Sequence, residues 1–391
     1  MTRPRLMIPG PIEFADDVLA AMSRPSPGHV DPTFIPVFGQ ALKDLRAVFQ
    51  AGEEAQPFIL TGSGTLAMDS AIANLVEPGD RALVIDTGFF SQRMADICRR
   101  YGAAVDVLSA APGETIAAAQ VSDRLAQADY DLVTLTHVDT STGVLTDAQG
   151  IASVVKAAGA LMVVDGVCSA GGEELRQGEW GVDVFLTASQ KAMGTPPGLA
   201  LFVASPAALA RWQGRRTPVA AYYSDWGLWL PIMQAYEAGR PAYFATPAVN
   251  LVLALAVSLA GILAEGVDQV FARHRLVSDA FKAGVSALGL GQVPTHPAHA
   301  AHTLTCPRYP AGVDAGLLPK VRASGAILAG GLHPAIRAEY FRIGHMGIIG
   351  RNDTLATLGA LEAGLRGCGH AVEPGLALAA AQAVLDGLRE G

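Results

Sequence analysis

Residues 161–198 read LMVVDGVCSAGGEELRQGEWGVDVFLTASQKAMGTPPG, and this stretch decides the fold. Two apolar runs, 161–164 and 182–186, have the composition of buried β-strands. An aspartate directly follows the first run, and a lysine follows the second run, just before a loop rich in glycine and proline. The stretch therefore predicts two strands that each deliver one ionisable side chain to the same edge of a sheet.

The same alternation of strands and helices extends from residue 56 to about residue 202. The β-rich runs are 58–60, 82–85, 104–108, 132–136, 161–164, 182–186 and 199–203. Strands alternating with helical segments predict an α/β fold with a mostly parallel seven-stranded sheet covered by helices on both faces. In such sheets, ligands bind beyond the carboxyl ends of the strands. Candidate functional residues are therefore sought directly after each run.

The second half of the chain predicts a smaller α+β domain. A stretch rich in proline and histidine, 294–310, precedes another αβ pattern that includes 340–343. We expect an N-terminal segment at 1–15, a large domain at 16–258 and a small C-terminal domain at 259–391. The 14-residue apolar run from Leu251 to Ala264 is shorter than the roughly 20 residues that span a bilayer, so it predicts a buried helix. Residues 376–388 have helical spacing.

Composition excludes several classes of function. Half of the 391 residues are apolar, but only 16% are charged, against roughly 25% in an average soluble domain, which predicts that a partner subunit covers part of the surface. A net charge of -8 leaves no basic field for nucleic acid. Neither end reads as a secretory or organelle address, so we expect a cytoplasmic protein that binds no membrane. The four cysteines lie far apart, which predicts reduced thiols and no metal site.

A glycine-containing turn follows the first strand of the sheet. Residues 61–65 read TGSGT and lead into a helical pattern that begins at Leu66. Glycines there let backbone N–H groups approach a phosphate, and a helix N-terminus favours its negative charge. A tight strand-to-helix turn with a Ser or Thr cap explains the same residues equally well, so both interpretations stay open at this point.

Asp165 and Lys191 are the ionisable residues of the opening stretch. Asp165 stands where a strand opens onto the predicted cleft, and a carboxylate there can keep a pyridine nitrogen protonated; a turn or helix cap is the alternative role. Lys191 comes 26 residues later, after the next strand and before 194–198. An isolated lysine is usually a solvated surface residue, but this position is poorly suited to solvation. In a desolvated site the amine can lose its proton and form a Schiff base.

This combination resembles the class V aminotransferases, a branch of the fold-type I pyridoxal-phosphate (PLP) enzymes, and within them most closely the alanine–glyoxylate aminotransferases. Four further strings occur in family order over nearly the whole chain: IPGP at 8–11, THVDTSTGVL at 136–145, VDGVCS at 164–169 and FRIGHMG at 341–347. The resemblance implies PLP as the cofactor, a large PLP-binding domain, and an N-terminal segment that closes over the active site.

The resemblance also implies roles for residues at matching positions. Lys191 would be the Schiff-base lysine and carry the proton between the substrate α-carbon and the C4′ atom of PLP, and Asp165 would pair with the pyridinium nitrogen. Both are predicted catalytic residues. The predicted contacts of the cofactor phosphate are Ser63, Gly64, Thr65 and Gln190. Phe90 would stack on the ring, where the family often has Trp, with packing in the core as its alternative role. Ser141 would lie at the ring hydroxyl, with Thr140 and Thr142 as alternatives. Some relatives have His at the position of Thr65.

Two further pairs complete the predicted site. Arg342 would clamp the substrate α-carboxylate through a two-pronged pair, with a surface salt bridge as its alternative role, and the backbone N–H of Gly10 would close over the same carboxylate. Tyr243 and Thr246 match a pair that, in this family, reaches across the dimer interface to the phosphate of the neighbouring subunit's cofactor. The resemblance therefore implies a homodimer. We expect the scattered histidines, such as those in THVDTSTGVL and FRIGHMG, to hydrogen-bond locally.

The resemblance implies a transamination in which L-alanine gives its amino group to glyoxylate, yielding pyruvate and glycine, with L-serine as a second donor, and ping-pong kinetics should follow. No acidic or strongly basic side-chain pocket is visible near the matching positions besides Arg342, which favours short, uncharged substrate side chains, although the loop 221–226 could also line the pocket. The partners expected are thus small amino acids and 2-oxo acids.

Several alternatives remain at this point. Serine–glyoxylate and pyridoxamine–pyruvate aminotransferases share the fold, but the latter carry an acidic residue where Ser63 stands. A cysteine desulfurase-like PLP lyase needs a mobile catalytic cysteine, and none of the four cysteines lies in a flexible Gly/Ser-rich loop. A nicotinamide oxidoreductase lacks its GxGxxG motif here. A PLP-binding module without catalysis would bind the cofactor but show no half-reaction with alanine.

Overall fold

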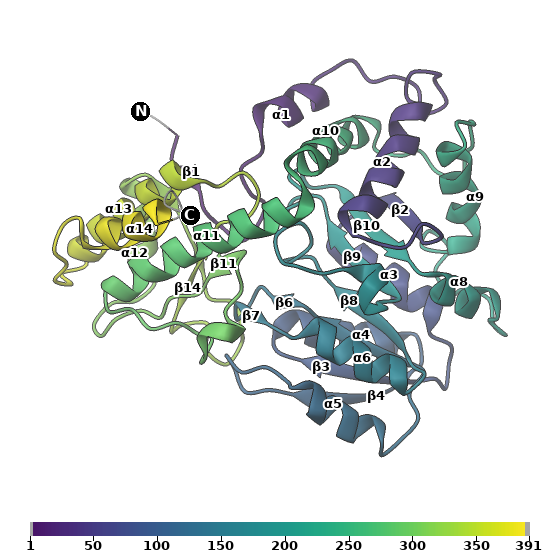
Figure 1. Cartoon of the computed structure of the whole chain (residues 1–391), viewed down its shortest axis with the longest axis horizontal. Helices are drawn as coiled ribbons and strands as arrows, with labels where there is room; N and C mark the ends of the chain where they lie inside the picture. Colours follow the sequence, from purple (N-terminus) through teal and green to yellow (C-terminus); the bar gives the residue numbers. More distant parts are fainter. Residues whose placement is uncertain (1–2, 388–391) are drawn as a thin grey trace.

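Figure 1 shows a computed structural model of the chain, which describes residues 3–387. Its central element is a seven-stranded sheet with the order β2-β10-β9-β8-β5-β3-β4. The strands are β2 (Gln56–Thr61), β3 (Arg81–Asp86), β4 (Ala104–Ser109), β5 (Leu132–Thr136), β8 (Leu161–Asp165), β9 (Val184–Ala188) and β10 (Leu199–Ala204). All seven predicted strands are confirmed, each within two residues at either end.

The sheet is mostly parallel, as predicted. The neighbours β9, β8, β5, β3 and β4 run parallel to one another, whereas β10 is antiparallel to both β2 and β9. The connections carry helices, as parallel strands require. These helices are α3 (Gly64–Leu75), α4 (Phe89–Arg100), α5 (Ala118–Leu125), α6 (Ala148–Ala157) and α7 (Gln177–Trp180), and a further helix, α8 (Pro206–Gln213), follows β10, the last strand of the sheet along the chain. The carboxyl ends of β8 and β9 therefore lie side by side.

Four more helices complete the large unit: α1 (Asp16–Met22), α2 (Ile35–Val48), α9 (Trp226–Glu237) and α10 (Val249–Glu265). One continuous hydrophobic cluster, from Phe34 to Leu259, fills the space between α2, α9, α10 and the sheet. At its centre, the ring of Trp226 stacks on Phe58 and Phe202, with centroids 5.5 and 5.9 Å away. This core holds the strand ends, and hence the residues after them, in fixed positions.

The C-terminal unit is smaller and has α+β composition. It contains α11 (Val267–Ala287), the 3-10 helix η1 (Pro297–His299), α12 (Leu317–Ala323), α13 (Arg351–Gly367) and α14 (Leu376–Asp386). Its three-stranded sheet has the order β11-β14-β13, formed by β11 (Leu304–Thr305), β14 (Phe341–Gly344) and β13 (Ala329–Gly330). A separate hydrophobic cluster, largely from α11 to α14, is its core. In Figure 1, α11 runs out from the large unit toward α12, α13 and α14.

The predicted three-part division of the chain stays a proposal that the packing supports. The hydrophobic clusters of the large and the small unit share no residues. The helices α10 and α11 meet at an angle of 87° around Gly266, and this bend favours a domain boundary there rather than at residue 258. Residues 1–2 of the predicted N-terminal segment and 388–391 of the predicted small domain, including the last position of the predicted helix 376–388, lie outside the described residues.

The predicted apolar helix at 251–264 is confirmed as α10, but the expectation that it is buried holds for one side only. Leu255 and Leu259 are buried, whereas Ala260, Gly261 and Ala264 are exposed. The reason is that α1 and α2 pack on one side of α10 and leave the other side uncovered within the chain. Among residues 3–387, no single helix is long and apolar enough to cross a membrane; α10 and α11 meet that criterion only together, as a bent pair.

The N-terminal segment joins both units. Its short strand β1 (Arg5–Leu6) pairs in parallel with β12 (Ala326–Ile327) of the small unit. A few residues later, Ile12 donates its backbone N–H to the carbonyl of Gln190, 3.3 Å away, in the large unit. A third hydrophobic cluster also lies between the units and includes side chains of the β-hairpin formed by β6 (Val138–Asp139) and β7 (Val144–Leu145). This junction surrounds the carboxyl edge of the central sheet.

Candidate active site

Asp165 and Lys191 occupy the edge of the sheet that the sequence predicts. Asp165 is the last residue of β8, and Lys191 follows the end of β9, which is the parallel neighbour of β8. Both residues are buried, with 2% of Asp165 and 8% of Lys191 exposed. The charge of each acts on the pKa of the other, so the two groups share one environment. The sequence thus brings a carboxyl and an amine together inside the protein.

Burial shifts both groups toward their neutral forms. Desolvation raises the pKa of Asp165 to about 7, against a hydrogen bond from the backbone N–H of Val167, 2.9 Å from Oδ1, that lowers it. Desolvation likewise lowers the pKa of Lys191, and the positive charge of Arg342 lowers it further, while Cys168 and Asp165 oppose this shift. A lysine with a lowered pKa has more of its amine unprotonated, which is the form that attacks a carbonyl group.

The N-terminal segment lies directly against Lys191. The amine of Lys191 donates a hydrogen bond to the carbonyl of Pro9. Gly10 has φ +115°, and a Cβ at this position would lie 2.6 Å from Cδ of Lys191 and 2.9 Å from its Nζ. Gly344 plays a matching part in β14, because a Cβ there would lie 2.2 Å from the carbonyl oxygen of Ile8. The strings IPGP and FRIGHMG, far apart in the sequence, are therefore in contact.

Ser63, Gly64 and Thr65 form the start of α3 beside these residues. Ser63 is the N-cap of α3, yet its side chain makes no capping hydrogen bond within the described chain, so the simple capping role is not observed. Gly64 is buried, and a Cβ there would lie 2.7 Å from Val167, in the turn after Asp165. The free N–H groups at the start of α3 therefore lie next to that turn, where they can bind an anion.

Gln190 follows the end of β9, and Arg93 contacts the start of α3 through Thr65. Gln190 precedes Lys191, and its buried Oε1 has no hydrogen-bond partner among the described residues. Thr65 is exposed, and its Oγ1 accepts a hydrogen bond from Nη1 of Arg93 at 2.9 Å. The guanidinium group of Arg93 in turn lies over the rings of Phe89 and Phe90, 5.2 and 4.9 Å from their centroids. A phosphate accepts hydrogen bonds, so the amide nitrogen of Gln190 and the guanidinium group of Arg93 are the groups here that could donate to a bound phosphorylated cofactor.

Phe90 and Ser141 lie on the neighbouring strand-to-helix connections. Phe90 is the second residue of α4 and is half-buried, outside the hydrophobic clusters of the core. Ser141 is fully buried, and its Oγ lies 2.6 Å from Oδ1 of Asp139. The backbone carbonyl of Ser141 also accepts a hydrogen bond from the hydroxyl of Tyr340. Asp139 and Tyr340 are therefore buried parts of the site to which the sequence assigned no role, although Asp139 also follows a strand.

Arg342 has the geometry of an anion-binding residue. It lies in β14, its Nε donates to the carbonyl of Gly330 at 2.8 Å, and its Nη1 donates to the carbonyl of Thr140 at 3.3 Å. Within residues 3–387 it forms no salt bridge with a carboxylate, so the alternative of a surface salt bridge is not observed. The two carbonyls fix the orientation of the guanidinium group while its charge remains available.

Tyr243 and Thr246 precede Ala248, whose N–H donates to Oγ1 of Thr61, 3.0 Å away, at the end of β2. Both are exposed, in the connection between α9 and α10; Tyr243 is 61% exposed and its ring packs on that of His29, with centroids 5.0 Å apart. A large aromatic side chain that is exposed to this extent can pack against a second chain.

The histidines of the two site strings behave differently from each other. His345 is buried, and its Nε2 hydrogen-bonds Oγ1 of Thr305 at 2.9 Å, as expected. The expectation of a local hydrogen bond is wrong for Nδ1 of His137, which is buried without a partner in the described part of the chain. Its burial lowers the pKa of His137 to about 4, so the ring is neutral.

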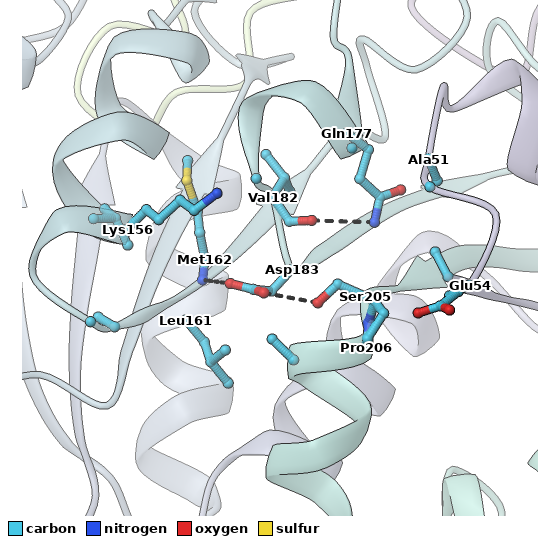
Figure 2. A pocket seen from close by; sticks show the side chains of 18 of the residues that line it. Ala51, Glu54, Lys156, Leu161, Met162, Gln177, Val182, Asp183, Ser205 and Pro206 are labelled. Atoms are coloured by element: carbon cyan, nitrogen blue, oxygen red, sulfur yellow. Dashed lines mark hydrogen bonds between the residues drawn. The ribbon is translucent and has the colours of Figure 1, made fainter.

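A cavity of about 610 Å³ lies elsewhere and contains none of the predicted site residues. It opens at the amino ends of β8 and β9, the edge opposite to Asp165 and Lys191. Figure 2 shows Asp183 at its base, where Oδ2 accepts from the N–H of Met162 and Oδ1 from the hydroxyl of Ser205, both at 2.8 Å. The carboxylate is thus satisfied internally, and we assign this cavity no part in the chemistry.

Comparison with known proteins identifies the family. Residues 13–341 match the family model described as aminotransferase class-V. The chain belongs to this family. The match covers most of the site residues, whereas Gly10 and Arg342 fall just outside it, so their assignment depends on the geometry described above. The class V aminotransferases are PLP enzymes, and the predicted cofactor and enzyme class are thereby confirmed.

Relatives with the same architecture cover nearly the whole chain. Alanine–glyoxylate aminotransferase 1 of Saccharomyces cerevisiae is 42% identical over 90% of this chain and 94% of its own length. Among solved structures, alanine–glyoxylate aminotransferase from Nostoc sp. superposes with a TM-score of 0.88 at 31% identity, covering 94% of this chain and 96% of that one. Pyridoxamine–pyruvate aminotransferase from Mesorhizobium loti superposes with a TM-score of 0.92 at 27% identity, covering 99% and 98%.

The raised pKa of Asp165 predicts a pH dependence of stability in the cofactor-free protein. Its folded-state pKa of about 7 lies above the unfolded value of about 3.9, so the unfolded chain loses this proton first. The free energy of unfolding should therefore fall as the pH rises from about 4 to about 7, by up to about 4 kcal/mol from this group. In the variant Asp165→Asn, this part of the decrease in the free energy of unfolding should be absent. Urea titrations at each pH, followed by circular dichroism, measure that free energy.

The exposed Asp129 provides a matched control. Asp129→Asn should leave the pH profile of the wild type unchanged. Identical profiles for wild type and Asp165→Asn would contradict the assignment of a buried, neutral carboxyl at this position.

Proposed function

We propose that this aminotransferase transfers an amino group from L-alanine to glyoxylate, giving pyruvate and glycine, with PLP attached to Nζ of Lys191 as a Schiff base. L-Serine is proposed as a second donor. The observation that carries the proposal is the convergence of three groups: Lys191 and Asp165 are buried at adjacent strand ends, and the charge of Arg342 acts on Lys191. When bound, PLP supplies an electron sink for the α-carbon of the substrate.

Lys191 and Asp165 would hold the two protons on which the reaction depends. The amine of Lys191, whose pKa is lowered by burial, would accept the proton from the α-carbon of the amino acid and return it at the other end of the exchange. Asp165 would pair with the ring nitrogen and keep its proton in place. Because Asp165 is 2% exposed, water would not compete for this hydrogen bond.

The remaining residues would orient the cofactor and the substrate. Ser63, Gly64, Thr65 and Gln190 would bind the phosphate at the start of α3, Phe90 would stack on the ring, and Ser141 would lie at the ring hydroxyl. Arg342 would bind the α-carboxylate that both the amino acid and the oxo acid carry. The backbone N–H of Gly10 would close over that carboxylate. Among residues 3–387, Arg342 is the cation whose charge lowers the pKa of Lys191, and the absence of a second one beside it supports substrates with short, uncharged side chains.

We further propose a cytoplasmic homodimer in which Tyr243 and Thr246 bind the phosphate in the neighbouring subunit. Their exposure within one chain supports this assignment, as does the uncovered apolar side of α10, the helix that follows them. The large PLP-binding unit would contribute the residues from the central sheet, and the small unit would contribute Arg342.

Burial of the thiols argues against a cysteine desulfurase activity. Such a reaction needs an accessible thiolate. Burial raises the pKa of Cys98 and Cys306 to about 12 and also raises the pKa of Cys168, which lies in the turn after Asp165. Cys368 is half-buried at the end of α13, in the small unit. Free pyridoxamine remains the main alternative donor, because the Mesorhizobium loti structure has the same architecture.

The half-reaction tests the proposed function directly. Purified holoenzyme mixed with L-alanine should lose its visible cofactor absorbance and release pyruvate, and added glyoxylate should restore the absorbance. Lys191→Ala should lose both the absorbance of the lysine-bound cofactor and turnover, because no other amine can take its place. Conversion with pyridoxamine and pyruvate, but not with alanine, would instead establish the alternative donor. Normal turnover in Lys191→Ala would refute the assignment.

Arg342→Ala should raise KM for both alanine and glyoxylate about 100-fold, because a charged, two-pronged hydrogen bond of about 3 kcal/mol is lost. Initial rates at varied substrate concentrations measure this. Arg308→Ala is the matched control, since that arginine pairs with the exposed Glu339 in the same unit. A loss confined to one of the two substrates would contradict a shared carboxylate site.

Mixed dimers test the role of Tyr243 and Thr246. The double variant Tyr243→Ala/Thr246→Ala should bind PLP more weakly and lose most of its activity. Unfolded and refolded together with Lys191→Ala, it should regain about a quarter of the wild-type activity, because half of the dimers are mixed and each mixed dimer holds one complete site. No recovery above the sum of the separate variants would show that both residues act within their own chain.

A further inference from the structure

Asp139 is a buried carboxylate to which the proposed reaction gives no role. It is 0% exposed and lies in β6, just beyond the carboxyl end of β5. Its Oδ1 accepts hydrogen bonds from the backbone N–H and the hydroxyl of Ser141, at 2.9 and 2.6 Å. Its Oδ2 accepts from the backbone N–H groups of Phe90 and Ser91, at 3.0 and 3.4 Å. One carboxylate thus joins the two segments that carry Phe90 and Ser141.

The same carboxylate caps α4 from a distant part of the chain. The N-cap position of α4 is Gly88, which has no side chain to bind the free N–H groups of the first turn. Asp139 binds two of these groups instead, and its negative charge is favourable at a helix N-terminus. A Cβ on Gly88 would lie 2.5 Å from Oγ of Ser141 and 2.6 Å from Cγ of Asp139. The glycine therefore leaves the space through which Asp139 reaches the helix.

Asp139 also determines where the proton of Ser141 points. A serine hydroxyl donates one hydrogen bond and accepts two. Every hydrogen-bond partner described for Asp139 is a donor, which is the pattern of an ionised carboxylate, so Ser141 gives its proton to Asp139. The Oγ of Ser141 accepts from the N–H of Phe89 at 3.0 Å. One lone pair of this hydroxyl is then left. Burial raises the pKa of Asp139 above its ordinary value, and these hydrogen bonds oppose that rise without cancelling it; the ionised form is inferred here from the four donors that converge on the two carboxylate oxygens.

We propose that Asp139 is a positioning residue for the cofactor: it anchors the first turn of α4 beneath Phe90, and it holds the proton of Ser141 so that this hydroxyl can only accept a hydrogen bond. The proposal rests on the proposed function, in which Phe90 stacks on the cofactor ring and Ser141 lies at the ring hydroxyl. A serine that can only accept favours the protonated form of that ring oxygen. A freely rotating serine would donate to it and favour the anionic form.

Two substitutions separate the two parts of this role. Asn is as good a helix cap as Asp, but it offers one acceptor oxygen instead of two. Asp139→Asn should therefore keep α4 anchored and release the proton of Ser141, whereas Asp139→Ala should lose both. Asp147→Asn is the matched control, because Asp147 caps α6 through the N–H of Gly150, at 2.9 Å, away from the site.

The first measurement needs no cofactor. Hydrogen exchange of the Phe90 and Ser91 amides in the cofactor-free protein should accelerate about tenfold or more in Asp139→Ala, as expected for a lost cap, but little in Asp139→Asn or Asp147→Asn. Unchanged exchange in Asp139→Ala would overturn the anchoring role. This readout holds even if the proposed reaction is wrong.

The second measurement is a pH titration of the visible absorbance of the bound cofactor. Asp139→Asn should shift the midpoint to lower pH by about one unit, because a donated hydrogen bond stabilises the anionic ring oxygen. In a Ser141→Ala background the same substitution should give a much smaller shift, since the hydroxyl proton is absent. No shift, or a shift of equal size in both backgrounds, would overturn the proposal. Wild-type protein that acquires no visible absorbance with PLP would instead refute the proposed function.

Discussion

The burial of a carboxyl and an amine at the ends of two adjacent parallel strands is the constraint on which this structure depends. Removing both groups from water is unfavourable unless each is neutral or has a partner. Here burial raises the pKa of Asp165 and lowers that of Lys191, and the carbonyl of Pro9 accepts a hydrogen bond from the lysine amine. The large core beneath the sheet provides the stability that keeps both groups out of water.

The sequence predicts the sheet well because strands of this kind are buried on both faces. Such strands are near-continuous runs of apolar residues, which a sequence shows clearly. Because ligands bind beyond the carboxyl ends of these strands, Asp165 and Lys191 are predicted as site residues. Asp139 also follows a strand, but its importance depends on contacts with Phe90, 49 residues earlier in the chain. A contact of that kind leaves no periodic pattern in the sequence.

Other differences arise where the fold depends on packing between elements. The apolar composition of α10 predicts a buried helix, yet composition does not reveal that the neighbouring helices pack on one side only. The boundary between the two units also depends on packing. Both the predicted position at 258 and the bend at Gly266 lie in an almost uninterrupted helical pattern of sequence. Only the division of the buried side chains into two hydrophobic clusters distinguishes the two positions.

The site explains why a family assignment is easier than a substrate assignment. Lys191, Asp165 and the start of α3 would act in the same way with any amino acid, because they would bind the cofactor or act at the α-carbon, which all amino acids share. Arg342 would recognise the α-carboxylate, which all these substrates share. Selection among side chains must therefore come from the shape of the remaining space, to which residues of several loops and, in the proposed dimer, of a second subunit would contribute.

The N-terminal segment links the two units to the lysine in a single stretch. Its β1 strand is paired with the small unit, Gly10 touches the side chain of Lys191, and Ile12 is bonded to the residue before that lysine. Any displacement of the small unit would therefore also displace the N-terminal backbone that covers the amine of Lys191. Residues 5–12 thus tie the position of the small unit to the backbone that shields the amine of Lys191.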